Sequence, residues 1–160
     1  MIIIAYKMKM KDLKKRISDE ILNSGFDVVG FSNIKIDRRT KSNYLNFLKK
    51  NYHGEMKWLE RHYDKKINPK LIWKDVKTIL VVGQNYSPPS NPIKYNNKKG
   101  KANISVYASN EDYHVVIKEK LKRIQYWLKN KLKLESKIFV DSSPNTRKVF
   151  CTKSKFRLAR

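Results

Sequence analysis

The sequence has a single cysteine, Cys151, among 160 residues. One thiol excludes an internal disulfide framework, and by itself it cannot hold an iron–sulfur cluster or a thiolate zinc site. This cysteine usage fits a reducing compartment, and we expect a cytoplasmic protein. His53, His62 and His114 form no i, i+4 pair, so no metal site is predicted from them.

Glycine and proline are also scarce, at 5 residues each, whereas hydrophobic residues make up 40% of the chain. This composition differs from that of a disordered tail or a fibrous repeat, so the chain should fold, and its length suits one domain. The apolar run at residues 1–6 is too short to span a membrane. Because its lysines follow the run, it also lacks the order of a signal peptide, and we expect no membrane association.

Acidic residues are outnumbered, with 14 Asp and Glu against 37 Lys and Arg, which gives a formal net charge of +23. Such a surface attracts polyanions, of which nucleic acid is the commonest in a cell. The alternative is that codon drift in an AT-rich genome has enriched lysine and that the excess charge is merely solvated. The lysines are scattered as well as clustered, so both interpretations remain open.

Helix-like and strand-like segments alternate along the chain. Apolar residues at helical spacing predict helices over 9–24, from about 42 to 51, over 55–62 and over 111–131, with a helical turn over 69–73. Short apolar runs predict strands over 26–31, 77–83 and 137–141, of which 77–83 should be central in a sheet. The polar stretch 87–100 predicts a long loop. This alternation predicts an α/β layer fold.

Widely used catalytic signatures are missing from the sequence: there is no G-x-G-x-x-G, Walker loop, H-E-x-x-H or nucleophile elbow. Polar residues gather instead where strands or loops meet helices, in the segments 53–59, 68–69, 83–86, 112–114 and 140–144. Ligands of α/β sheets collect beyond the carboxyl ends of strands. Asp141 and the run 84–86 both occupy that position.

These segments, in this order and spacing, resemble the N-terminal half of the epoxyqueuosine reductases, cobalamin-dependent enzymes that finish queuosine synthesis on tRNA. The resemblance covers residues 8–144. The family patterns GxxGxMxWL, R/K-x-x-P, VxxxNY, ISxYAxxxDYH and FVD-(S/T)-(S/A)-P appear at residues 52–59, 66–69, 81–86, 104–114 and 139–144. The resemblance implies a cobalamin-binding-type domain with a mixed sheet flanked by helices, incomplete at its C-terminus.

The resemblance also implies a reaction, in which an epoxide oxygen is removed reductively from a modified base in a tRNA anticodon. Cobalamin supplies the reducing cobalt in that family, and two 4Fe–4S clusters supply the electrons. The family's clusters need eight cysteines downstream of the matched region, so we expect the iron–sulfur clusters to be absent from this chain.

Asp141 matches the family's proposed proton donor. An aspartate with the ordinary pKa of about 3.9 is almost fully ionised at neutral pH, so this role requires surroundings that raise its pKa. The alternative is an N-cap, because Asp-Ser-Ser-Pro is also a good start for a helix. The other matched residues are expected to line the site: Lys66, Val106 and Tyr107 on the cofactor side, and Asp112, Tyr113 and His114 on the substrate side.

Several of the residues expected on the cofactor and substrate sides also have a simpler structural interpretation. Lys66 replaces an arginine of the family, cannot make the same bidentate contact, and could be an ordinary solvated lysine. Residues 106–107 could belong to a core strand, and Tyr113 lies on the apolar stripe of its predicted helix.

The resemblance stops after Pro144, and residues 145–160 carry six basic residues and no acidic one. With one choice of permitted codons, dropping the first base turns this segment into ILEKYFAQKANLGWQG, which restores the family pattern. We therefore expect a family domain over 1–144 and a frameshifted, non-native tail over 145–160. Such a tail should be disordered or poorly packed, with no role for Cys151.

Three functions follow from these observations. The first is a reductase domain that binds cobalamin and a tRNA base and is inactive alone. The second is a basic RNA-binding module without catalysis, and the third is the product of a decayed gene with no present function. Cobalamin binding separates the first from the others, and salt-sensitive tRNA binding separates the second from the third. We favour the first for ancestry and the third for activity.

Overall fold

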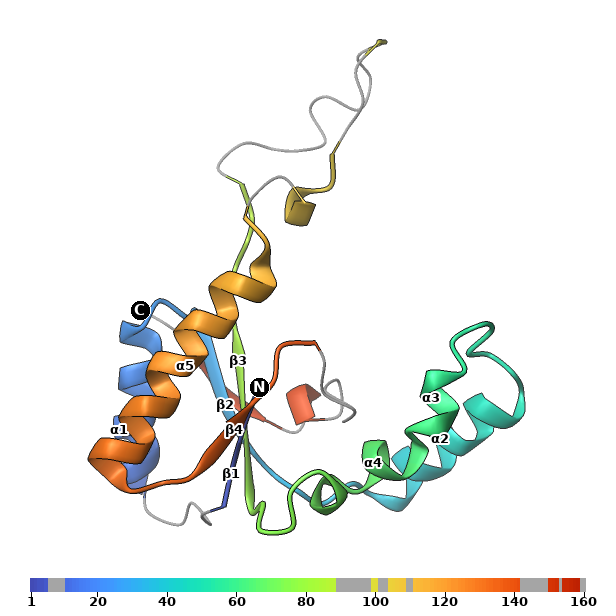
Figure 1. The fold of residues 1–160 in the computed structure, drawn as a ribbon, viewed down its shortest axis with the longest axis horizontal. Helices are drawn as coiled ribbons and strands as arrows, with labels where there is room; N and C mark the ends of the chain where they lie inside the picture. The colour runs from blue at the N-terminus through green and yellow to red at the C-terminus, as the bar shows by residue number, and fades with distance from the viewer. Residues whose placement is uncertain are drawn as a thin grey trace.

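The computed structural model describes residues 1–5, 11–88, 99–100, 104–108, 111–141, 150–152 and 154–158. Its centre is a sheet of five strands in the order β4-β1-β3-β2-β5 (Figure 1). The strands are β1 (Ile2–Ile4), β2 (Val28–Asn33), β3 (Thr78–Gly83), β4 (Ser136–Ile138) and β5 (Lys155–Leu158). The α/β class is confirmed, and β3 is the central strand, as predicted.

Every strand pair in the described sheet is antiparallel, so the expectation of a mixed sheet is wrong. The sheet is antiparallel because of β1, a segment that was predicted only to be a short apolar run. β3 and β4 run in the same direction, but β1 lies between them and pairs antiparallel with both, placing Ile2 opposite Leu80 and Ile138. All three isoleucines of β1 are fully buried.

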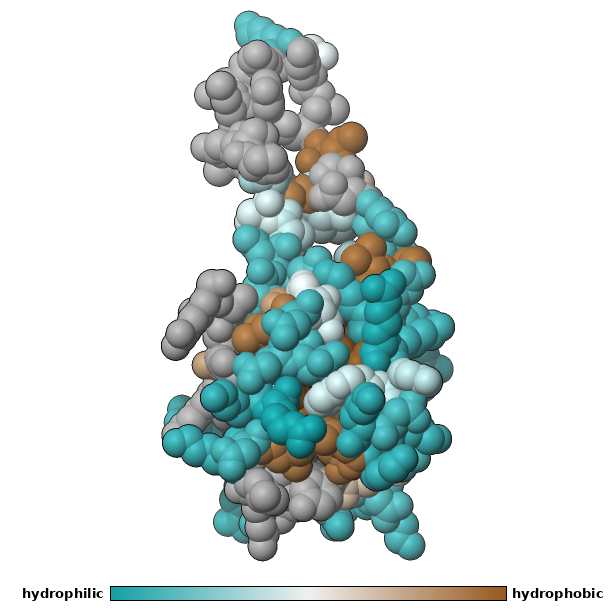
Figure 2. All heavy atoms as spheres, turned by 90° about the vertical axis from the view of Figure 1, so that its left-hand side faces the viewer, coloured by the Kyte–Doolittle hydropathy of each residue, from teal (hydrophilic) through white to brown (hydrophobic). Residues whose placement is uncertain are grey.

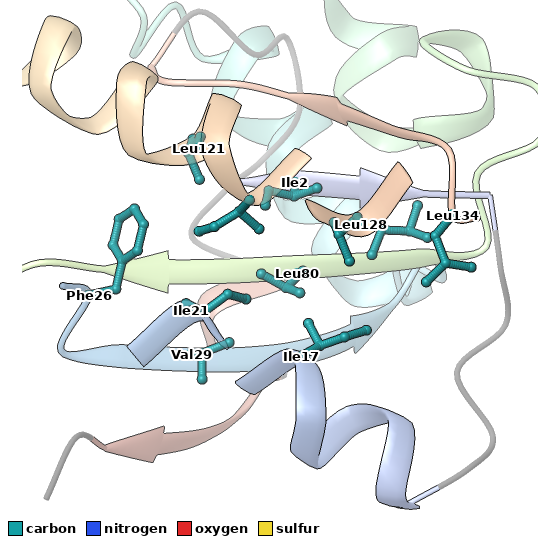
Figure 3. Close-up of a cluster of buried hydrophobic side chains, with 11 residues drawn as sticks. Ile2, Ile17, Ile21, Phe26, Val29, Leu80, Leu121, Leu128 and Leu134 are labelled. Carbon is teal, nitrogen blue, oxygen red and sulfur yellow. The ribbon is translucent and has the colours of Figure 1, made fainter. Parts of the chain in front are cut away.

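One face of the sheet is covered by α1 (Lys11–Asn23) and α5 (Tyr113–Leu132) (Figure 1). Both helices agree with the predicted ranges to within two residues. Figure 3 shows their buried side chains, such as Ile17, Ile21 and Leu121, meeting Ile2 and Leu80 of the sheet. This cluster of apolar side chains is the larger core, and it fixes α5 against the sheet.

The opposite face is closed by a second apolar cluster around Ile3, Ile79 and Phe150. Phe150 is fully buried, and β5 pairs with β2. The expectation that residues 145–160 are poorly packed is therefore wrong for the described residues 150–152 and 154–158. The backbone of β2 offers hydrogen bonds to any neighbouring strand, and Gly30 leaves room for it, since a Cβ there would lie 2.6 Å from that of Ser154.

The remaining helices project from this second face: α2 (Arg38–Lys49), α3 (Trp58–Arg61), α4 (Tyr63–Ile67) and the 3₁₀ turn η1 (Pro69–Leu71) (Figure 1). α2 begins four residues earlier than predicted, because Asp37 caps it by accepting a hydrogen bond of 2.7 Å from the backbone N–H of Thr40. The predicted helix over 55–62 is shorter, and α4 follows it after His62.

Between β3 and α5 lies a 3₁₀ turn, η3 (Val106–Ala108). The predicted loop over 87–100 lies largely outside the described residues, as does the proposed domain boundary after Pro144. A search of the helices in the described segments finds none with the length and apolar character needed to cross a bilayer.

Candidate functional site

Four of the predicted site residues meet at one end of the sheet. Asp141 lies three residues after β4, while Asp112, Tyr113 and His114 form the start of α5. The hydroxyl of Tyr113 donates a hydrogen bond to Oδ2 of Asp141. His114 Nε2 lies 3.6 Å from the same oxygen. Two neighbouring residues of α5 therefore share the carboxylate of Asp141, which lies 28 positions after Tyr113 in the sequence. We call these four residues the carboxylate cluster.

The backbone at Asp141 has a positive φ of 53°, in the left-handed region. Aspartate is one of the few residues that tolerate this conformation, because its short polar side chain bonds locally. An N-cap residue has an extended backbone instead, so the geometry of Asp141 does not suit the helix-cap alternative. Residues 142–149, which would form that helix, lie outside the described residues.

Asp112 caps α5 and also orients His114. Its Oδ1 accepts a hydrogen bond of 2.9 Å from the backbone N–H of His114 and lies 2.9 Å from Nδ1 of the same residue. The backbone hydrogen bond, followed by the contact with the imidazole, lowers the pKa of the Asp112 carboxyl. The ring of Tyr113 stacks on that of His114 with centroids 4.1 Å apart. His114 is thus held between two carboxylates, with one ring nitrogen toward each.

A second polar group lies at the same end of the sheet, where β3 ends. The ammonium of Lys120 donates hydrogen bonds of 3.0 Å to the carbonyl of Gly25 and to Oε1 of Gln84. The backbone N–H of Asn85 donates one of 2.6 Å to Asp27. Asp141 and the run 84–86 thus both lie just beyond the carboxyl ends of strands, β4 and β3, as predicted. The contacts of Lys120 were not predicted from the sequence, because its position in the helical pattern indicates only a solvated face.

Exposed apolar side chains lie near the carboxylate cluster in the chain. Ile104 is 71% exposed, Tyr107 61% and Val115 46%. Figure 2 shows brown apolar groups on the surface at this upper part of the molecule. Val106 and Tyr107 lie in η3, with Val106 half-buried, so the core-strand alternative for them is wrong. A 3₁₀ turn leaves Tyr107 at the surface, where a ligand can reach it.

Lys66 is not brought to the carboxylate cluster. It lies in α4, among the helices on the other face of the sheet (Figure 1). Its side chain is buried, and Nζ lies 4.9 Å from the ring centroid of Trp58, which is a cation–π contact. The solvated-lysine alternative is therefore wrong, and the neighbouring indole is the physical reason for the burial.

In the described part of the chain, no three His, Cys, Asp or Glu side chains are arranged so that they could hold a metal ion. His53 is the histidine with an unusual environment. It is buried near Phe47, and within the described residues its Nδ1 has no hydrogen-bond partner. The sequence motif at 53–59 marked this segment but no role for the imidazole.

Comparison with known proteins gives a family match. A family model described as "Epoxyqueuosine reductase QueG, DUF1730" matches residues 66–142, a range that contains all seven predicted site residues. Curated relatives named epoxyqueuosine reductase include one from Cellulophaga algicola, 34% identical over 149 residues, covering 92% of this chain and 46% of the relative. Another, from Cyclobacterium marinum, is 32% identical over 131 residues, covering 81% and 41%.

A third relative of the same name, from Leadbetterella byssophila, is 32% identical over 146 residues and covers 91% of this chain and 47% of the relative. The chain therefore spans less than half the length of these relatives. No solved structure matches it.

Proposed function

Because the chain belongs to the epoxyqueuosine reductase family, we propose that it forms the part of such an enzyme that binds cobalamin and delivers a proton to a modified tRNA base. The observation that carries this proposal is the carboxylate cluster, in which Tyr113 and His114 both approach Oδ2 of Asp141. All four of its residues lie in the matched region. We propose a cytoplasmic location, as the lone cysteine and a tRNA substrate suggest.

The residues around this cluster fit cobalamin in their chemistry. A corrin ring is broad and largely apolar, with amide groups at its edge. The exposed side chains of Ile104, Tyr107 and Val115 offer apolar surface, and the carboxylate cluster, which is close to them in the chain, offers polar partners. When bound, cobalamin would supply the reducing cobalt for the reaction. Lys66 is buried against Trp58, so we propose that it supports the fold of α4 and does not contact this cofactor.

The chain's own contribution is proton transfer. Reduction of an epoxide to an alkene consumes two electrons and two protons and releases the oxygen as water. Asp141 would give one proton to the departing oxygen. Because the hydrogen bond from Tyr113 favours the ionised carboxylate, this role requires water to be excluded from Asp141 during the reaction. His114, which is half exposed and 3.6 Å from Oδ2, can take a proton from solvent and return it to Asp141. Asp112 holds the imidazole in place from its other nitrogen.

We propose that the isolated chain does not complete this reaction. Its 160 residues contain one cysteine, and a single thiolate cannot ligate the clusters that supply electrons in the family. The purified chain should therefore show no iron–sulfur absorption and should leave epoxyqueuosine in tRNA unreduced. Turnover by the chain alone with a chemical reductant would contradict this expectation.

Cobalamin binding is the decisive experiment. Titration of the purified chain with cobalamin, followed by the absorption spectrum of the corrin, should show saturable binding. A matched variant, Tyr107→Ala, should bind more weakly because it loses exposed apolar surface, whereas Tyr126→Ala, on the exposed face of α5, should not. If no binding occurs, the second candidate remains, a basic RNA-binding module without catalysis, which the net charge of +23 favours.

A further inference from the structure

A second candidate site lies at the opposite end of the sheet from the carboxylate cluster. An open pocket of about 870 Å³ is formed where β2 ends and β3 begins, with Phe31 and Val76 in its lining. Six charged residues line it, five of them basic: Lys14, Lys35, Lys70, Lys74, Lys77 and Asp75. We call it the lysine pocket.

The strand register separates the two sites. Asn33 and Thr78, which pair with each other, line the lysine pocket, whereas Val28 and Gly83 pair at the other end of β2 and β3. Six residues of strand span about 20 Å. The lysine pocket is therefore distinct from the site proposed for cobalamin and the reacting base.

The lysines of this pocket come from separate parts of the chain. Lys14 lies on α1, Lys35 follows β2, Lys70 lies in η1, and Lys74 and Lys77 lead into β3. A solvated helix face would draw its lysines from one element, so the gathering here is a product of the tertiary structure. Five lysines and one aspartate in the lining make the charge of the pocket positive, which favours a bound anion.

Lysine is also suited to one kind of anion in particular. Its ammonium is a compact charge on a flexible stem, which contacts phosphate without the fixed geometry of a guanidinium. Contacts of this type position a nucleic acid and do not read its sequence. Four of the five lysines are exposed, and Lys14 is half-buried with Nζ 5.8 Å from the ring centroid of Phe31.

We infer that the lysine pocket binds backbone phosphates of RNA. The inference rests on the proposed function for the identity of the polymer, because the family's substrate is a tRNA. The pocket holds the RNA about one strand length away from Asp141, so it orients the molecule without touching the reacting base. The five lysines of the pocket, which are part of the net charge of +23, would then have the specific role of binding RNA.

The test compares two double variants with the same loss of charge. Lys74→Gln with Lys77→Gln changes the lysine pocket, and Lys118→Gln with Lys131→Gln changes two exposed lysines of α5. We expect the pocket variant to bind tRNA roughly tenfold more weakly than the original chain at moderate salt. Its slope of logarithmic affinity against logarithmic salt should fall by about one to two. The α5 variant should stay within about twofold.

The results separate the competing explanations. Equal losses in both variants would overturn the inference, since the attraction would then be diffuse. Strong competition by inorganic phosphate or pyrophosphate at concentrations that do not change the ionic strength would overturn the RNA assignment and indicate a site for a small anion. Unchanged thermal unfolding of both variants is the control for folding. Cobalamin titration of the original chain is an independent readout, so failure of the proposed function is distinguishable from failure of the lysine pocket.

Discussion

Tyr113 and Asp141 are joined by a hydrogen bond in which the tyrosine hydroxyl donates to Oδ2 of the carboxylate. This contact connects the first turn of α5 to the chain that follows β4. In the sequence, Tyr113 fits the apolar stripe of its helix as well as a polar site. The structure leaves its side chain 37% exposed and pairs it with the carboxylate, which supports the site interpretation.

Asp141→Asn should leave cobalamin affinity nearly unchanged. Asparagine tolerates the left-handed backbone at this position, and its carbonyl oxygen can still accept the hydrogen bond from Tyr113. It cannot act as an acid, so proton delivery alone is removed. Titration with cobalamin measures the affinity of this variant. Tyr113→Phe is titrated beside it, because it removes the hydrogen bond to Asp141 and keeps the ring stacked on His114. A large loss of affinity in Asp141→Asn would instead assign Asp141 a structural role.

Asp112 should make the stability of α5 sensitive to acid. Its pKa lies below the ordinary value for an aspartate, chiefly because the backbone N–H of His114 donates to the carboxylate. A lowered pKa in the folded state contributes stability that is present above the unfolded value and is lost as the pH falls through the folded value. Asp112→Asn keeps a capping oxygen but cannot titrate.

The measurement is the thermal midpoint at about pH 5 and about pH 3. The original chain should lose more than Asp112→Asn over this interval, while all other carboxylates contribute equally to both. Equal decreases of the thermal midpoint in the two proteins would show that the helix cap does not depend on the charge of Asp112.

Ile3→Ala should destabilise the protein strongly. The side chain is fully buried in β1 between two other strands, so truncation removes apolar contacts and leaves a cavity. Such substitutions cost about 2 to 5 kcal/mol. Denaturant unfolding measures the loss, and Ile104→Ala, at a position 71% exposed, should change stability by less than about 0.5 kcal/mol. Equal losses of stability at the two positions would show that β1 is not part of the folded sheet.

Phe150→Ala tests whether residues after Pro144 are part of the fold. Phe150 is fully buried in the second apolar cluster, and loss of a core phenylalanine costs about 3 to 5 kcal/mol. Phe156→Ala, at a position 44% exposed in β5, should cost less. If denaturant unfolding finds Phe150→Ala as stable as the original chain, the expectation of a poorly packed tail is restored.

The coding DNA decides whether residues 145–160 arise from a frameshift. We propose that residues 1–144 are the family domain and that the codons of the remainder, read one base later, encode E-K and then G-W, as the family pattern does. An out-of-frame tail can still form β5, because strand pairing uses backbone groups that every residue except proline offers in full. A shifted reading without E-K and G-W would show that the idea is wrong.

The sequence by itself determined the local elements and the family. α1, α5 and β3 were predictable because the spacing of their apolar residues is a property of each segment alone. The motifs also singled out residues 112–114 and Asp141, in separate segments, and the structure brings them together. Only the tertiary structure decided that β1 lies between β3 and β4 and pairs antiparallel with both, whereas a mixed sheet was expected. A run of three isoleucines has no period to interpret, and its partners lie more than 70 residues away. The lysine pocket depends in the same way on contacts between distant segments, which no local pattern encodes.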